Sequence, residues 1–162
     1  MNLKAGVVIG VSLAFAISLC SIPAVADSTA DPCTDTEAAC TASVPRCQSA
    51  TSPCVVNLKF NPPSGVSVMV NGQSAPLFCV QHGNAVKWTT DPGMSYTVTF
   101  RATHKPFANA VITGSASSPH SEKISPAALP PPAQACFVYS VDVTGPGGKH
   151  GTADPKVVVT GP

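Results

Sequence analysis

The sequence predicts an all-β protein, an antiparallel sandwich of seven to eight short strands that follows a small disulfide-stapled N-terminal segment. After residue 55, short runs rich in β-branched and aromatic residues recur at regular intervals and are separated by turn residues, which is typical of such sandwiches. The same part of the chain has no convincing helical period of apolar residues. Four cysteines spaced seven residues apart precede it and predict the stapled segment.

The chain opens with the layout of a secretory signal peptide. Lys4 precedes an apolar run over residues 5–19, Pro23 interrupts the run, and Ala-Val-Ala at 24–26 has the small-x-small pattern that signal peptidase cleaves. A membrane anchor is the alternative, but a helical span needs about 20 apolar residues, more than this run supplies. We therefore predict cleavage after residue 26, a secreted or periplasmic location, and no membrane span in the mature chain.

The predicted parts are a signal peptide (1–26), a cysteine-rich appendage (27–54) and a β-sandwich domain (55–162). The 136 residues left after cleavage suit one domain with a small appendage. Loss of Lys4 with the leader lowers the Lys+Arg count from nine to eight, which equals the Asp+Glu count. Because no basic patch with interleaved aromatics is present, nucleic acid is not an expected partner.

Six cysteines remain after cleavage, an even number that predicts disulfides in an exported chain. Zinc knuckles have two to four residues between paired cysteines, whereas six residues separate neighbouring cysteines here. No histidine lies between the four clustered cysteines, so a metal site is not expected. The predicted disulfide cysteines are Cys33, Cys40, Cys47, Cys54, Cys79 and Cys136.

The pairing within the appendage depends on where the chain turns back. Residues seven apart lie about 10.5 Å apart in a helix, whereas a disulfide needs Cα atoms within about 7 Å. Asp31 and Pro32 are suited to start a helix over 34–42, and Pro45 and Pro53 favour turns after it.

This pattern favours a nested hairpin, with Cys33 bonded to Cys54 and Cys40 bonded to Cys47. Adjacent pairing, Cys33 to Cys40 and Cys47 to Cys54, is the rival. Without bridges the appendage would be a disordered tail, because it contains few large apolar side chains.

Cys79 and Cys136 each lie in or beside a predicted strand. We expect these two cysteines to bond to each other and clip two β elements together. The alternative is that each pairs with the N-terminal cluster, which would dock the appendage on the sandwich.

Eight runs of the body have strand character. Asn71-Gly72 between the second and third runs is a strong hairpin signal. Residues 114–135 form a long crossover rich in Ser, Ala and Pro, in which 121–125 can add a short edge strand. The eight predicted strands are residues 55–60, 66–70, 75–80, 85–90, 96–102, 109–113, 136–143 and 156–160.

Alternation along these strands predicts one set of inward side chains, with the single tryptophan, Trp88, central between the sheets. Each fully buried large apolar side chain contributes about 1.5 to 3 kcal/mol, so the body can form its own core. The predicted core residues are Phe60, Val68, Val70, Leu77, Val86, Trp88, Tyr96, Val98, Phe100, Phe107, Phe137, Tyr139, Val141, Val157 and Val159.

A cupredoxin copper site needs a cysteine and a histidine close together on one loop, with a methionine ligand. Cys136 fits poorly, because the next histidine, His150, lies fourteen positions on, and Met69 and Met94 both precede it. The other histidines, His82, His104 and His120, are isolated in turns or loops.

The chain has few groups for hydrolytic chemistry. No Gly-x-Ser-x-Gly nucleophile elbow is present. The only carboxylates that could form a glycosidase pair in the body are Asp91, Glu122, Asp142 and Asp154.

The body also combines Trp88 on an early strand, flanking Cys79 and Cys136, the Pro106-Phe107 pair, and the run CFVYSVDV leading to ADPKVVV. Together these features resemble small bacterial exported β-sandwich proteins of immunoglobulin-like or cupredoxin-like shape, over about residues 55–160. The resemblance implies an immunoglobulin-like arrangement of the sandwich. It implies no activity, because a fold does not specify a function.

The sequence thus predicts a secreted or periplasmic binding or structural module that is not an enzyme and carries no cofactor. The expected partner is an unidentified protein or cell-surface ligand. The alternatives are a protease-inhibitor-like protein, which the cysteine-rich appendage suggests in general style, and a metal-binding relative of the cupredoxins.

Overall fold

The computed structural model describes residues 33, 35, 37–49, 51–63, 65–125 and 135–161. They belong to one compact unit that spans Asp31–Pro162, and the predicted signal peptide lies outside them. The described chain is almost entirely β, and its helical residues are two 3-10 turns, η1 (Glu37–Ala39) and η3 (Pro146–Gly148). The prediction of an all-β protein is confirmed, whereas the domain boundaries stay predictions.

Twelve strands form one mixed sheet. All eight predicted runs are found, as β2, β3, β5 to β8, β10 and β12, and the short edge strand expected in the crossover is β9. The strands are β1 (Arg46–Cys47), β2 (Cys54–Asn61), β3 (Gly65–Val70), β4 (Gln73–Ser74), β5 (Leu77–Gln81), β6 (Ala85–Thr90), β7 (Ser95–Phe100), β8 (Val111–Ser115), β9 (His120–Lys123), β10 (Ala135–Thr144), β11 (His150–Ala153) and β12 (Lys156–Thr160).

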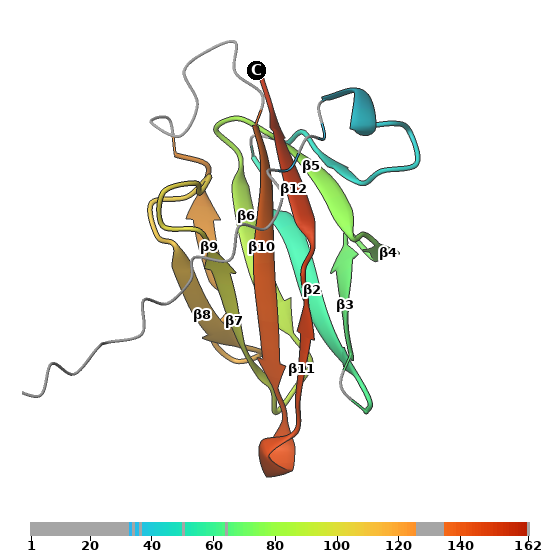
Figure 1. Cartoon of the computed structure of the whole chain (residues 1–162), viewed down its shortest axis with the longest axis vertical. Helices are drawn as coiled ribbons and strands as arrows, with labels where there is room; N and C mark the ends of the chain where they lie inside the picture. The colour runs from blue at the N-terminus through green and yellow to red at the C-terminus, as the bar shows by residue number, and fades with distance from the viewer. Residues whose placement is uncertain are drawn as a thin grey trace, which may run out of the picture. The chain divides into compact units, whose positions relative to one another are not determined.

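The hydrogen-bonded strands follow two paths around the core (Figure 1). One path runs β8–β7–β10–β12–β5–β1, and the other runs β9–β6–β2–β3, with β4 beside β3. β11 pairs with β10 from the first path and with β3 from the second, so it joins them. The core lies between these two groups of strands.

Four strand pairs are parallel: β1 with β5, β5 with β12, β2 with β6, and β3 with β11. The prediction of a wholly antiparallel sandwich is therefore wrong. Turn signals in the sequence specify only neighbours joined by a tight hairpin, which are antiparallel. The parallel pairs all join strands that are distant in the sequence, so no local signal predicts them.

The chain after the Asn71-Gly72 turn shows how a parallel pair arises, that of β5 with β12. Both residues have positive φ, 49° and 84°, as the two-residue hairpin turn requires. The hairpin pairs Val70 with Gln73 but includes only the two residues of β4. After Pro76 the chain leaves β3, and β5 pairs with β12 and β1 instead.

β11 and β12 act as one long partner of β10. The register that pairs Val141 with Ala153 continues unbroken to the pair of Val138 with Lys156. Between them the Tyr139 amide donates to the Pro155 carbonyl at 3.1 Å. Because the chain bends at this point, its two halves find different outer neighbours, β3 and β5.

The core is centred on Trp88, as predicted. Its side chain is 0% exposed, and its ring meets the edge of Phe107 with centroids 4.9 Å apart. Phe107 also contacts Phe100, which stacks on Tyr139 at 5.0 Å. Of the predicted core residues, only Phe60 and Leu77 are partly buried, because they lie at strand ends.

The predicted helix over 34–42 is wrong, since the described part of this stretch contains only the 3-10 turn η1. The chain then extends, and β1 adds to the edge of β5, with Arg46 opposite Cys79. The Cys79 amide donates to the Pro45 carbonyl at 2.9 Å. The appendage therefore lies along the body.

All six predicted cysteines form disulfides, but the preferred pairing is wrong. Neither the nested hairpin nor the clip between the two body cysteines occurs. Both body cysteines pair with the appendage, the alternative that docks it, because β1 lies against β5. The rival adjacent pairing is right for one bond. The disulfides are Cys33–Cys136, Cys40–Cys79 and Cys47–Cys54, with Cα atoms 5.3, 6.0 and 5.3 Å apart.

Candidate functional site

The six described cysteines are all bonded in disulfides, which argues against a metal site among them. Cys33, Asp35 and Cys136 bring their ligand atoms within 4.8 Å of one another. The two sulfur atoms are bonded to each other, so neither is the thiolate that binds metal. The same bond argues against the cupredoxin alternative, which needs Cys136 as a copper ligand. Instead, Asp35 forms an ion pair with Lys156, with Oδ2 and Nζ 2.9 Å apart, which helps to fasten the appendage to β12.

The predicted polar candidates form two separate histidine–carboxylate pairs and otherwise lie apart. Two histidines meet carboxylates: Nε2 of His120 lies 3.4 Å from Oε2 of Glu122, and Nδ1 of His150 lies 3.8 Å from Oδ2 of Asp142. The second pair is largely exposed. His82 and Asp91 lie in turns, Asp154 lies between β11 and β12, and His104 lies in the loop between β7 and β8.

That loop, residues 101–110, is held at several points. The Phe100 amide donates to the Ala110 carbonyl at 2.7 Å and closes the base of the loop. The Ser125 amide donates to the Pro106 carbonyl at 2.8 Å and fixes its middle. Phe107 is 1% exposed and inserts into the core against Trp88. These contacts give the loop a defined shape.

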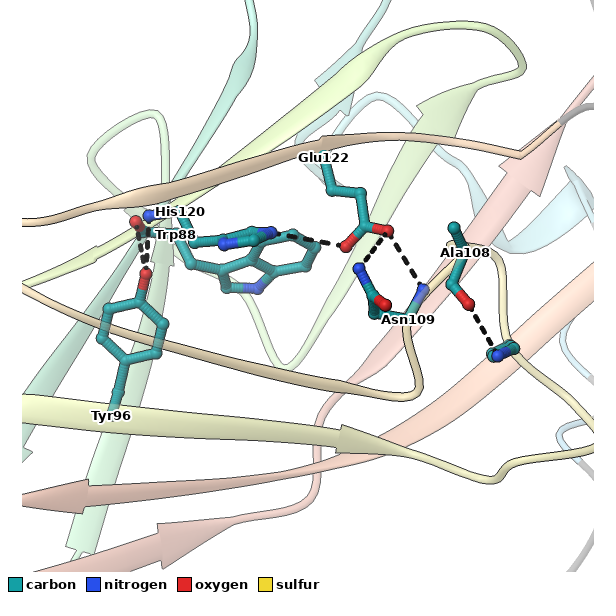
Figure 2. Close-up of polar contacts among 7 residues, drawn as sticks. Trp88, Tyr96, Ala108, Asn109, His120 and Glu122 are labelled. Atoms are coloured by element: carbon teal, nitrogen blue, oxygen red, sulfur yellow. Dashed lines mark hydrogen bonds and ion pairs between the residues drawn. The ribbon is translucent and has the colours of Figure 1, made fainter.

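A carboxylate from β9 fastens the far side of the loop. Oε1 of Glu122 accepts hydrogen bonds from the backbone amide and the side-chain amide of Asn109, at 3.0 and 3.2 Å (Figure 2). Its other oxygen faces His120. Glu122 thus holds the loop through Oε1 alone, which favours a structural role for this residue.

The Tyr96 side chain connects β9 to β6. Its hydroxyl donates to the Trp88 carbonyl and accepts from the His120 amide, both at 2.9 Å (Figure 2). Burial raises the pKa of Tyr96, and the hydrogen bond from His120 partly offsets this rise. A side chain at Gly114 would collide with the Tyr96 hydroxyl. β6, β7, β8 and β9 are therefore locked together under the loop.

The loop borders an open pocket of about 370 Å³, a volume in the range of small-molecule sites. The rings of Phe107 and Phe137 lie beneath it and are almost completely buried. The lining residues with accessible surface are Ala102, Thr103, His104, Lys105, Ala108 and Ser125. None of the described residues that line the pocket is acidic.

His104 is fixed at one wall of the pocket. Its ring stacks on Phe137, with centroids 4.5 Å apart, and its Nε2 lies 3.0 Å from the Cys136 carbonyl. A carbonyl oxygen can only accept, so Nε2 carries the proton in this contact. Because Cys136 is bonded to Cys33, the disulfide also stabilises this wall.

Lys105 supplies the positive charge. It is half-buried, and its Nζ donates to the Ala108 carbonyl at 2.6 Å. No described carboxylate forms an ion pair with it. Since an ammonium group has three donors, two remain after this hydrogen bond.

Comparison with known proteins assigns no family. No protein-family model matches the chain, and no curated protein matches it. The site therefore has to be interpreted from its own chemistry. It combines an open pocket, a few accessible apolar groups and a few polar groups. Sequence reasoning treated His104 as an isolated loop residue and attached no role to Lys105. The only hint in the sequence was the neighbouring Phe107, which was predicted to be a core residue and so to anchor this loop.

Proposed function

We propose that this protein is an exported, non-catalytic binding module in which an immunoglobulin-like variant of the β-sandwich presents the 101–110 loop and its pocket to a ligand. The observation that carries the proposal is the pocket itself, which lies beside a loop that specific contacts hold in place. Loops positioned by a rigid β scaffold are common binding sites. The exposed His104 ring and the methyl groups of Ala102 and Ala108 offer apolar contact, and Thr103, Lys105 and Ser125 offer hydrogen bonds.

The disulfides support export. The three bonds suit an oxidising compartment outside the cytoplasm, which agrees with the signal-peptide pattern in residues 1–26. The described residues contain no helix long and apolar enough to cross a membrane.

Export is tested by expressing the full chain in a bacterial host and fractionating the cells. We expect a processed protein outside the cytoplasm that starts at Asp27. A non-reduced peptide map should contain the three bridges of the structure. Six free thiols, or retention of residues 1–26 in the membrane, would contradict the proposal.

Binding is tested by screening a fragment library with NMR against the isotope-labelled mature protein. We expect some fragments to shift signals of the 101–110 loop. Ala102→Trp should abolish these shifts by filling the pocket, since Ala102 lines it and is exposed. Ser49→Trp, at an exposed site outside the pocket, is the matched control. A screen that shifts no loop signal, or shifts that persist in Ala102→Trp, would refute the proposal.

A further inference from the structure

We infer that the ligand of this pocket is a small organic carboxylate with an aromatic or compact apolar body. This inference rests on the proposed binding function and adds the chemical class of the ligand. It follows from the charge of the pocket, the number and kind of its donors, and its accessible apolar groups.

The charge of the pocket is positive and uncompensated by the described residues around it. Lys105 contributes an ammonium group, and the described lining has no acidic side chain. Glu122 is the carboxylate fastened to the same loop, but both of its oxygens face other groups, the amides of Asn109 and the ring of His120. An anionic ligand would therefore supply the missing counter-charge.

The free donors suit a single carboxylate. Lys105 has two N–H donors left after its bond to Ala108. The hydroxyls of Thr103 and Ser125 line the same pocket, and neither has a hydrogen-bond partner among the described residues. Hydrogen bonds between an ammonium group and a carboxylate are short and stronger than neutral ones.

A phosphate is less suitable than a carboxylate. Phosphate sites usually combine several backbone amides, often at a helix N-terminus, with Arg or Lys. In the middle of this loop, the Pro106 nitrogen carries no hydrogen. The His104 amide donates to the Arg101 carbonyl at 3.1 Å. One lysine and two hydroxyls match one negative charge better than two.

The accessible apolar surface of the pocket suits an apolar body. Phe107 and Phe137 are each 1% exposed, and His104 stacks on Phe137, so a ligand cannot reach the two phenyl rings. The apolar groups that a ligand can reach are the exposed ring of His104 and the methyl groups of Ala102 and Ala108. Aromatic rings favour offset-stacked or edge-to-face partners. A ligand such as benzoate could place its ring against His104 while its carboxylate reaches Lys105.

The test uses three probes of matched shape, benzoate, neutral benzamide and cationic benzylamine, with inorganic phosphate as a fourth. Binding to the disulfide-intact mature protein is measured by NMR titration. We expect benzoate to bind about tenfold or more tightly than benzamide, and benzylamine and phosphate to leave the loop signals unchanged.

Variants locate the charge. Lys105→Met keeps the length of the side chain, removes its charge, and should weaken benzoate binding about tenfold without affecting benzamide. Lys105→Arg keeps the charge and should retain most of the affinity. Lys149→Met, at an exposed lysine in the turn between β10 and β11, is the control and should bind like the parent.

The outcomes separate the inference from the function on which it rests. If benzamide binds as well as benzoate and Lys105→Met changes neither, the pocket is a binding site but the inferred ligand class is wrong. The class is also wrong if phosphate shifts the loop as strongly as benzoate. If these probes and the fragment library all leave the loop unmoved, the proposed function fails together with the inference.

Discussion

Residues 33–53 and 54–161 are held in place by different means. In the first region the buried described side chains are Cys40, Pro45 and Cys47, two of which are half-cystines. In the second region a continuous apolar core surrounds Trp88. The first region has almost no core of its own, so covalent bonds replace packing there. A short exported segment can thus keep a defined place without large apolar residues.

The three disulfides differ in the length of chain that they close. The residues joined are 103, 39 and 7 positions apart for Cys33–Cys136, Cys40–Cys79 and Cys47–Cys54. In the chain-entropy model these loops correspond to about 4.7, 3.9 and 2.5 kcal/mol of stabilisation. The two bonds that close the longer loops, Cys33–Cys136 and Cys40–Cys79, therefore contribute most.

Truncation of the central aromatic residue should have the largest effect and should act on the body. Trp88→Ala is expected to lower the free energy of unfolding by about 3 to 5 kcal/mol, because it leaves a cavity among Phe107 and its neighbours. Urea unfolding followed by far-UV circular dichroism measures the loss. Val111→Ala, at a residue that is 55% exposed, should stay within about 0.5 kcal/mol of the parent. Equal effects of the two substitutions would contradict this description of the core.

Removal of one bridge should loosen the appendage locally while the body stays folded, because the other two bridges still hold it. Cys40→Ala with Cys79→Ala is expected to cost up to about 4 kcal/mol, and hydrogen exchange should rise first in residues 37–49. Removing Cys47 and Cys54 in the same way should cost less, about 2.5 kcal/mol. If loss of the 40–79 bridge made exchange rise equally throughout β6 and β7, the two regions would form one cooperative unit and the contrast would be lost.

The two tyrosines of the body should respond with opposite signs. Tyr96→Phe removes the hydroxyl that joins the Trp88 carbonyl to the His120 amide, so a loss of about 1 to 2 kcal/mol is expected. The Tyr139 hydroxyl is buried without a partner among the described residues. Tyr139→Phe should therefore stabilise the protein by about 1 kcal/mol. Thermal and urea unfolding of the two variants give the comparison, and a common sign would refute it.

Alkaline titration provides a second readout of the same pair. Burial raises the pKa of Tyr139 far above its ordinary value of 10.0. A raised pKa in the folded state gives stability that is complete below the ordinary pKa and is lost as pH rises above it. Unfolding should accompany tyrosinate absorbance above about pH 10, and Tyr139→Phe should shift both to higher pH. Ionisation of both tyrosines near pH 10 in a folded protein would contradict their burial.

The smallest effect is expected at the ion pair between Lys156 and Asp35. Its side chains are 45% and 32% exposed, so solvent screening limits the contribution to less than about 1 kcal/mol. Lys156→Met should slightly raise hydrogen exchange around Asp35 at low salt, and 1 M salt should remove the difference. Lys59→Met, at an exposed lysine of β2, is the control. A large increase in hydrogen exchange would mean that the ion pair, as well as the disulfide bonds, holds the appendage in place.

Local patterns predicted the strands and most of the core. The alternation in 85–90 gives β6 its bounds and places Trp88 inward, because a half-buried strand needs period two. Asn71-Gly72 gave the turn for the same kind of reason. These features depend on a few consecutive residues, so they can be predicted from a single sequence without knowledge of distant contacts.

The disulfide map and the pocket were not predictable in this way. Cys79 is bonded to Cys40 because β1 pairs in parallel with β5, which is a contact between segments distant in the sequence. His104 meets Phe137 because β10 crosses the end of the loop. Both depend on which strands become neighbours, and no turn signal specifies that choice. The helical interpretation of 34–42 failed because tertiary context overrides a weak propensity.

The placement of β12 has a consequence for assembly. β12 lies in the interior of its layer, with β10 on one side and β5 on the other. Until this strand is in place, both neighbours present an open edge that another polypeptide could occupy. Because β12 follows both neighbours in the sequence, this layer closes only after residues 156–160 have been synthesised.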